Sequence, residues 1–144
     1  MKFLLTLALL VTTNVFAIDL CSFEETWQFD EALEAQGIKP LKVSANHKAF
    51  TNVEKQLIYT AVIQQGWLSK STMKEALETF GDYFEGGRQG ENKGEIQYFN
   101  IKGQKLAVVH YWPGDNEYGA VFKHVNGQYF LIATIDDSFI SCKK

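Results

Sequence analysis

Two histidines and one glutamate are the side chains of this sequence whose spacing suggests chemistry. His110 and His124 lie in neighbouring apolar segments near the C-terminus, and hairpin pairing predicts that Glu95 lies opposite His110. A carboxylate beside an imidazole orients it as a general base or contributes to a metal site. The predicted register holds the two histidines several residues apart, too far to share one divalent ion. We therefore expect structural or surface histidines, with a small hydrolase using His110 and Glu95 as the alternative.

The loop from Trp112 to Glu117 is the second candidate, because it gathers acidic and amide groups between two predicted strands. Its Pro, Gly, Asp and Asn residues are also those that turns require. Asp115 and Glu117 are predicted to form an acidic rim with Asp136 and Asp137, since the turns that carry them lie at the same end of the meander. The calcium-loop spacing is absent. The rim fits a basic partner, or the carboxylates of a hydrolase.

Turn residues assign the side chains of this region to two faces of a sheet. Asn126-Gly127 and Lys102-Gly103 predict two-residue hairpins, and we assume that the turn from Trp112 to Tyr118 closes symmetrically. One face then carries the amphipathic residues that suit a binding surface: Glu95, His110, Trp112, Tyr118, Phe122, His124 and Tyr129. The other is leaner, holds Ile96, Val109, Val121 and Phe130, and is predicted to lie under the helices. A slip of one residue would invert this assignment, and a core on both faces is the alternative.

The elements that position these residues are an antiparallel meander and the helices before it. Gly94 to Cys142 predicts four to five strands. Capping boxes at Ser22, Thr51 and Thr72 predict three helices ahead of it, and residues 38–44 predict a connector or an edge strand. The segment from Gly81 to Gly94 predicts a glycine-rich flexible loop. The fold class is therefore α+β, with the N-terminal helices packed on one face of the meander.

The N-terminus and the cysteines indicate the compartment. Residues 1–17 have a single Lys2, an apolar stretch and the ending Val15-Phe16-Ala17, which predicts a secretory signal peptide followed by one domain over residues 18–144. The two cysteines of the chain, Cys21 and Cys142, lack the Cys-x-x-Cys spacing of reactive thiols. In an oxidising compartment they predict a disulfide that closes the domain.

Charge and motif content restrict the function. With 14 basic and 17 acidic residues the chain has a net charge of −3, so it lacks the excess of basic residues that is typical of a nucleic-acid-binding protein. No motif predicts a metal or another cofactor, and no membrane attachment is expected once the signal peptide is cleaved. The sequence thus predicts a small secreted or periplasmic binding protein for a protein or envelope ligand, such as an inhibitor, and leaves its oligomeric state open.

Overall fold

The computed structural model describes residues 18–64, 72–78, 80, 94–112 and 116–143. Their core is an antiparallel sheet of six strands whose spatial order follows the chain. The strands are β1 (Lys42–Ser44), β2 (Glu95–Ile101), β3 (Gln104–Tyr111), β4 (Tyr118–Val125), β5 (Gln128–Asp136) and β6 (Phe139–Cys142). The helices are η1 (Leu20–Ser22), α2 (Thr26–Ala35), η2 (His47–Ala49) and α3 (Asn52–Gln64), and residues 73–78 are also helical. The α+β class is confirmed, with six strands where four to five were predicted.

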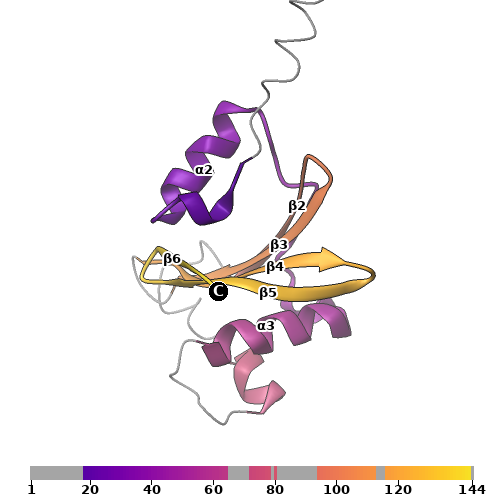
Figure 1. Cartoon of the computed structure of the whole chain (residues 1–144). Coiled ribbons are helices and arrows are strands. Elements are labelled where there is room, and N and C mark those ends of the chain that lie inside the picture. The colour runs from indigo at the N-terminus through magenta and orange to yellow at the C-terminus, as the bar shows by residue number, and fades with distance from the viewer. Residues whose placement is uncertain (1–17, 65–71, 79, 81–93, 113–115, 144) are drawn as a thin grey trace, which may run out of the picture.

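Helices α2 and α3 lie on opposite faces of the sheet (Figure 1), so the prediction that the helices share one face was wrong. Ile58 of α3 belongs to a buried cluster with Ile96 of β2, whereas Phe29 of α2 belongs to a second cluster with Phe99 of the same strand. Successive residues of a strand point to opposite sides, so the meander is apolar on both. Each side therefore requires a helix, and we call the two sides the α2 face and the α3 face.

The helix ends follow most of the predicted caps. At α3 the Thr51 hydroxyl accepts the Glu54 N–H (3.1 Å) and the Glu54 carboxylate accepts the Thr51 N–H (3.0 Å), and the same reciprocal pair occurs between Thr72 and Glu75. Helix α2 begins at Thr26, four residues after the predicted cap. Ser22 ends the preceding η1 instead, and its hydroxyl donates to the Asp19 carbonyl (2.6 Å). The capping box of α2 is made by Glu25 and Gln28.

The two-residue turns fix part of the register. Lys102 and Gly103 have φ of 53° and 84°, and Asn126 and Gly127 have φ of 51° and 79°, the left-handed backbone that a type I′ turn needs. The pairing of Glu95 with His110 is confirmed. A symmetric turn from Trp112 to Tyr118 would pair these two residues. In the structure Tyr118 pairs with Tyr111 instead, so the register of β3 with β4 differs from the prediction by one residue.

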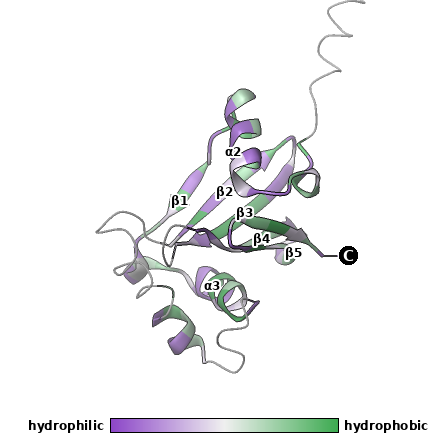
Figure 2. Ribbon diagram, turned by 90° about the vertical axis from the view of Figure 1, so that its left-hand side faces the viewer, coloured by the Kyte–Doolittle hydropathy of each residue, from purple (hydrophilic) through white to green (hydrophobic). Residues whose placement is uncertain are grey.

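This slip of one residue moves β4 and β5 to the faces opposite those predicted. Phe122 lies on the α3 face with Ile96, while Val121 lies on the α2 face with Val108. A bulge between Val121 and Phe122 then shifts the pairing of β4 with β5. The central strands β3 and β4 are largely hydrophobic and β1 is hydrophilic in Figure 2. Both faces of the meander are consequently core.

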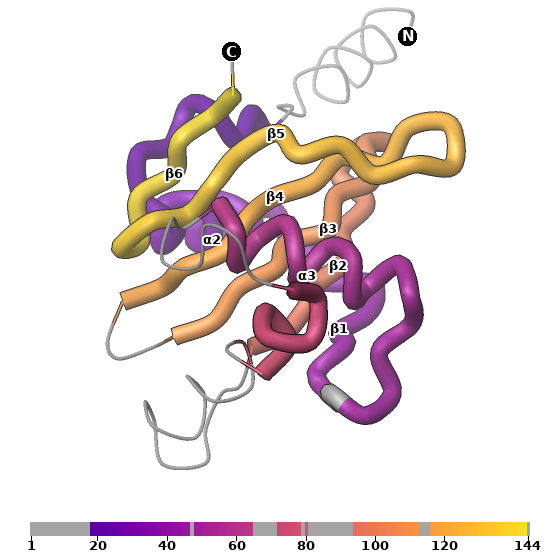
Figure 3. The backbone as a smooth tube through the Cα atoms, turned by 90° about the horizontal axis from the view of Figure 1, so that it is seen from below, coloured from indigo at the N-terminus to yellow at the C-terminus, as the bar shows by residue number. Residues whose placement is uncertain are grey.

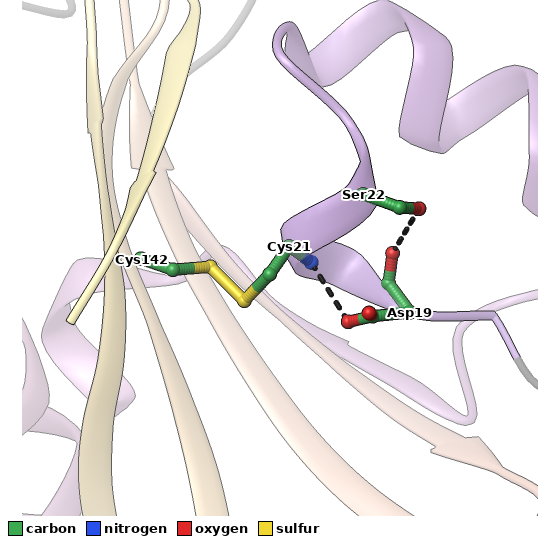
Figure 4. The surroundings of a disulfide bond; sticks show 4 residues. All are labelled: Asp19, Cys21, Ser22 and Cys142. Carbon is green, nitrogen blue, oxygen red and sulfur yellow. Dashed lines mark hydrogen bonds between the residues drawn. A yellow bond between two sulfur atoms is a disulfide. The ribbon is translucent and has the colours of Figure 1, made fainter. Parts of the chain in front are cut away.

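The predicted disulfide between Cys21 and Cys142 is confirmed (Figure 4), with Cα atoms 5.8 Å apart. It joins η1 to the end of β6, across a sequence separation of 121 residues. The predicted signal peptide, the loop over residues 82–93 and Asp115 lie outside the described residues. Within the described part of the chain, no helix has the length and hydropathy needed to cross a membrane.

Candidate functional site

His110 lies at the centre of a buried group of charges on the α2 face. Its Nδ1 atom is 2.6 Å from Oε2 of Glu117, and its Nε2 atom is 3.1 Å from Oε1 of Glu95. The exposed fractions of His110 and Glu117 are only 6% and 7%. The ring of Trp112, which directly follows β3, contacts the imidazole at 4.6 Å between ring centroids, with an angle of 49° between the ring planes. With Asp30 of α2, whose charge also acts on this group, these residues form what we call the His110 cluster: Asp30, Glu95, His110 and Glu117.

Local structure explains why these side chains meet. The β2–β3 hairpin places Glu95 opposite His110, and Gly119 is the partner of His110 on β4. A Cβ atom at Gly119 would lie 1.8 Å from the Val109 carbonyl oxygen, so only glycine fits there. The Glu117 N–H donates to the Ser138 hydroxyl (3.0 Å), and the Ser138 N–H donates to the Glu117 carbonyl (2.8 Å). The β5–β6 turn thus holds the Glu117 backbone in place.

The protonation state of His110 follows from these contacts. Burial lowers the pKa of an imidazole, but the hydrogen bonds and charges of Glu117 and Glu95 outweigh it and raise the pKa of His110 to about 9. At neutral pH the ring is therefore an imidazolium that donates one N–H to each carboxylate. Asp30 is exposed on one side, yet desolvation, followed by the charge of Glu117, raises the pKa of its carboxyl to about 6.

This geometry does not suit the predicted hydrolase. A general base needs a free ring nitrogen within reach of a substrate proton, and both nitrogens of His110 are engaged by carboxylates. The recess beside the cluster has room for about one water molecule. Among the described residues, no three His, Cys, Asp or Glu side chains converge as metal ligands. We interpret the His110 cluster as a structural ionic network.

The protonation of the cluster makes stability depend on pH. The pKa of His110 rises from 6.5 in the unfolded chain to about 9 in the fold, so its contribution is complete below pH 6.5 and is lost as pH increases through 9. Ionisation of Asp30, whose pKa is raised to about 6, acts in the same direction at lower pH. We expect urea titrations between pH 6.5 and 9 to show the free energy of unfolding falling by roughly 3 kcal/mol. A His110→Gln variant should show a flatter profile, and an unchanged wild-type stability across this range would contradict the assignment.

The predicted binding residues do not form one surface. His110, Trp112 and Glu117 lie on the α2 face, and Glu117 is buried, so it is not part of an exposed acidic rim. The remaining described residues lie on the α3 face: Tyr118, Phe122, His124 and Tyr129. The rings of His124 and Tyr129 are in contact, 4.6 Å between centroids and tilted by 48°. The slip in the β3–β4 register separates the two groups.

An open apolar groove lies on the α3 face, between α3 and the β4–β5 hairpin, which extends beyond the helix in Figure 3. Its volume is about 390 Å³. Its apolar lining consists of Val53 and Leu57 from α3 and Phe122, Tyr129 and Leu131 from the hairpin. Val53 is 55% exposed at the mouth, while Leu57 and Phe122 are buried. We call this feature the hairpin groove.

The rim of the hairpin groove is polar and uncharged. It is formed by Gln56 and Thr60 of α3 and by Gly127 and Gln128 of the hairpin turn. No ionisable group other than the Tyr129 phenol is among its lining residues, and burial raises the pKa of that phenol above its ordinary value. The groove therefore offers a surface for uncharged, apolar groups.

Sequence reasoning identified Phe122 and Tyr129 but missed the α3 wall of the groove. The signal was present, because Val53, Gln56, Leu57 and Thr60 follow the i, i+3, i+4, i+7 spacing of one helix face. The spacing could not show that this helix face lies beside the β4–β5 hairpin. Glu117 as the partner of His110 had no local signal, since six residues of loop separate the two strands.

Fold and site together define a small disulfide-closed α+β protein with a buried ionic network and an open apolar groove. No family model matches this chain, and neither the curated proteins nor the solved structures contain a match to it.

Proposed function

We propose that this chain is a secreted or periplasmic binding protein that receives apolar side chains of a partner protein in the hairpin groove. The groove itself carries the proposal. Its volume is within the usual range of ligand sites, and its apolar floor is ringed by neutral hydrogen-bonding groups. Half-exposed Val53, together with the His124 ring in contact with Tyr129, supplies the mixed apolar and polar contacts of recognition surfaces.

The disulfide and the N-terminal sequence support the compartment. A bond between Cys21 and Cys142 persists where the environment is oxidising, as outside the cell or in the periplasm. The predicted signal peptide over residues 1–17 is the matching export signal. A binding role also needs no catalytic group, consistent with an imidazole whose two nitrogens are occupied.

Site-specific photo-crosslinking tests the proposal. A benzophenone amino acid replaces Val53 at the groove mouth or, as the matched control, Phe130, which is 51% exposed on β5. Phe130 points to the face opposite Tyr129 because strand side chains alternate. We expect adducts to a discrete protein in an envelope extract from position 53 and none from position 130.

A charge placed in the rim provides the second arm of this experiment. Gln56→Lys should reduce the adduct at position 53 by about tenfold, since an ammonium disfavours apolar contact, whereas Gln36→Lys at the end of α2 should leave it unchanged. Equal adducts at positions 53 and 130, or none at 53, would remove the groove as the binding site. An adduct with the mass of a lipid or another small molecule would assign the groove to a different ligand class.

A further inference from the structure

The two edges of the sheet differ in how they are covered. At the β6 edge the Ile140 N–H donates to the Glu24 carbonyl (2.8 Å), the Thr26 N–H donates to the Ser138 carbonyl (3.0 Å), and Glu25 bridges Phe139. The chain before α2 therefore occupies that edge. At the opposite edge, β1 pairs with β2 alone among the described strands, and it lies at the outside of the sheet in Figure 2. Alternate backbone groups of such a strand point outward and can pair with an added strand.

The chain on either side of β1 is basic, although the protein is acidic, and the Glu54 carboxylate of α3 is the acidic group that acts on Lys42. No Asp or Glu occurs between Glu34 and Glu54, while Lys39, Lys42 and Lys48 fall in this interval and are exposed. The net charge of the whole chain is −3. A positive local field of this kind favours an acidic ligand.

The two faces of β1 have different chemistry. Lys42 lies on the α3 face, where its ammonium is 5.8 Å from the centroid of the Tyr98 ring. Val43 pairs with Gln97 on the α2 face and is 47% exposed, and the preceding Leu41 is 71% exposed. An edge protected against pairing usually carries charges and few apolar groups. β1 carries such a charge in Lys42, but its one apolar residue, Val43, and the adjacent Leu41 are exposed.

A groove lies on the α2 face and is lined in part by Gln97, the partner of Val43 on β2. It has a volume of about 310 Å³ and lies between α2 and β2, where Leu33, Ile38 and Phe99 line it together with Gln97. Asp30 and Glu34 are on its α2 wall, so an acidic group is disfavoured inside it. An added strand would place every second side chain on the α2 face, beside Val43, and the intervening ones on the α3 face, beside Lys42.

We propose that the β1 edge binds an extended segment of a partner protein in which apolar residues alternate with Asp or Glu. The apolar residues pack beside Val43 and the groove, and the acidic residues meet Lys42, with Lys39 and Lys48 at the two ends. A second copy of this chain is a poorer occupant, because two paired β1 edges bring their lysines together. This site is separate from the hairpin groove, so failure of one proposal leaves the other standing.

Peptide titration followed by amide NMR of the whole domain tests the inference. The probe is an acetylated peptide of about eight residues in which Glu and Val alternate. The controls are a Lys–Val alternating peptide, a Glu–Ser alternating peptide and a block peptide of the same Glu and Val content. We expect shifts of the Leu41 to Ser44 amides with the Glu–Val peptide, and binding weaker by about tenfold or more with each control.

Variants locate the site. Lys42→Glu should weaken binding by about tenfold and shift the preference toward the Lys–Val peptide, whereas Lys143→Glu beyond the β6 edge should leave both unchanged. Spectra that match the wild type away from residues 39–48 show that each variant is folded. Equal binding of the Glu–Val, Lys–Val and block peptides, or shifts confined to other strands, would overturn the proposal. A dimer seen in sedimentation velocity, with a dimer fraction that Lys42→Glu changes, would also overturn the proposal. That result would assign the β1 edge to a second copy of the chain.

Discussion

Replacing His110 with leucine is expected to lower the free energy of unfolding at neutral pH by about 3–5 kcal/mol. The substitution removes the cation that lies 2.6 Å from Glu117 and 3.1 Å from Glu95. Glu117 is 7% exposed and would remain as a buried, uncompensated carboxylate. Glu95 retains partial contact with solvent, so the loss of its partner costs less free energy. Urea denaturation of the wild type and the variant at pH 7 measures the difference.

A double variant separates the loss of the ion pair from the loss of packing. In His110→Leu with Glu117→Leu, neither residue leaves a buried charge, and apolar replacement of a buried pair is often neutral. We expect this double variant to regain at least about 2 kcal/mol relative to His110→Leu alone. A cost below about 1 kcal/mol for the single variant, or additive costs in the double variant, would show that the ionic network contributes little.

The His110 cluster also fixes the register between β3 and β4. The imidazole on β3 binds the carboxylate that directly precedes β4, and Gly119 lies opposite His110 because a Cβ there would meet the Val109 carbonyl. A slip of one residue would separate Glu117 from His110 and bring a side chain into that place. Buried polar pairs serve to select one register in other folds. We infer the same role for the pairing of β3 with β4.

Local chemistry is the part of this fold that could be predicted from sequence. The two-residue turns at Asn126-Gly127 and Lys102-Gly103 require positive φ, which glycine and asparagine tolerate, so these turns determine which residues of their hairpins pair. The capping box at Thr51 similarly fixes the start of α3. The six-residue connection between β3 and β4 has no such requirement, and the prediction failed there by one residue. That single error reversed the faces of β4 and β5, since strand side chains alternate with a period of two.

The candidate sites were less predictable because they depend on long-range contacts. Glu95 and His110 share a hairpin and were paired correctly, whereas Glu117 reaches His110 only through a long loop and a turn held by Ser138. The hairpin groove needs Val53 of α3 beside Tyr129 of β5, and these residues are far apart in the chain. The prediction that both helices share a face concealed this contact. An apolar pattern on both sides of β2 to β4 would have favoured the alternative with two cores.

Removal of the disulfide is the second large effect that we expect. The bond between Cys21 and Cys142 encloses nearly the whole described domain, and a loop of about 100 residues gives a chain-entropy contribution of roughly 4.7 kcal/mol as an upper figure. It also keeps Ile18 and Leu20, which are buried on the α2 face, close to β6. The variant Cys21→Ser with Cys142→Ser should lose about 2–5 kcal/mol of unfolding free energy in urea.

The denaturant dependence distinguishes an effect on the unfolded chain from one on the fold. Without the bond the unfolded ensemble expands and exposes more surface, so the m-value should increase together with the loss of stability. Damage restricted to the native state would lower stability with an unchanged m-value, and amide exchange would then be faster at Leu20 and along β6 alone.

Ser22→Ala is the matched control, because it removes the hydrogen bond from the Ser22 hydroxyl to the Asp19 carbonyl and retains the disulfide. Its loss should stay near 1 kcal/mol, the usual contribution of an exposed hydrogen bond. An equal loss in the two variants would show that the local turn, and not the covalent closure of the chain, stabilises this end of the domain.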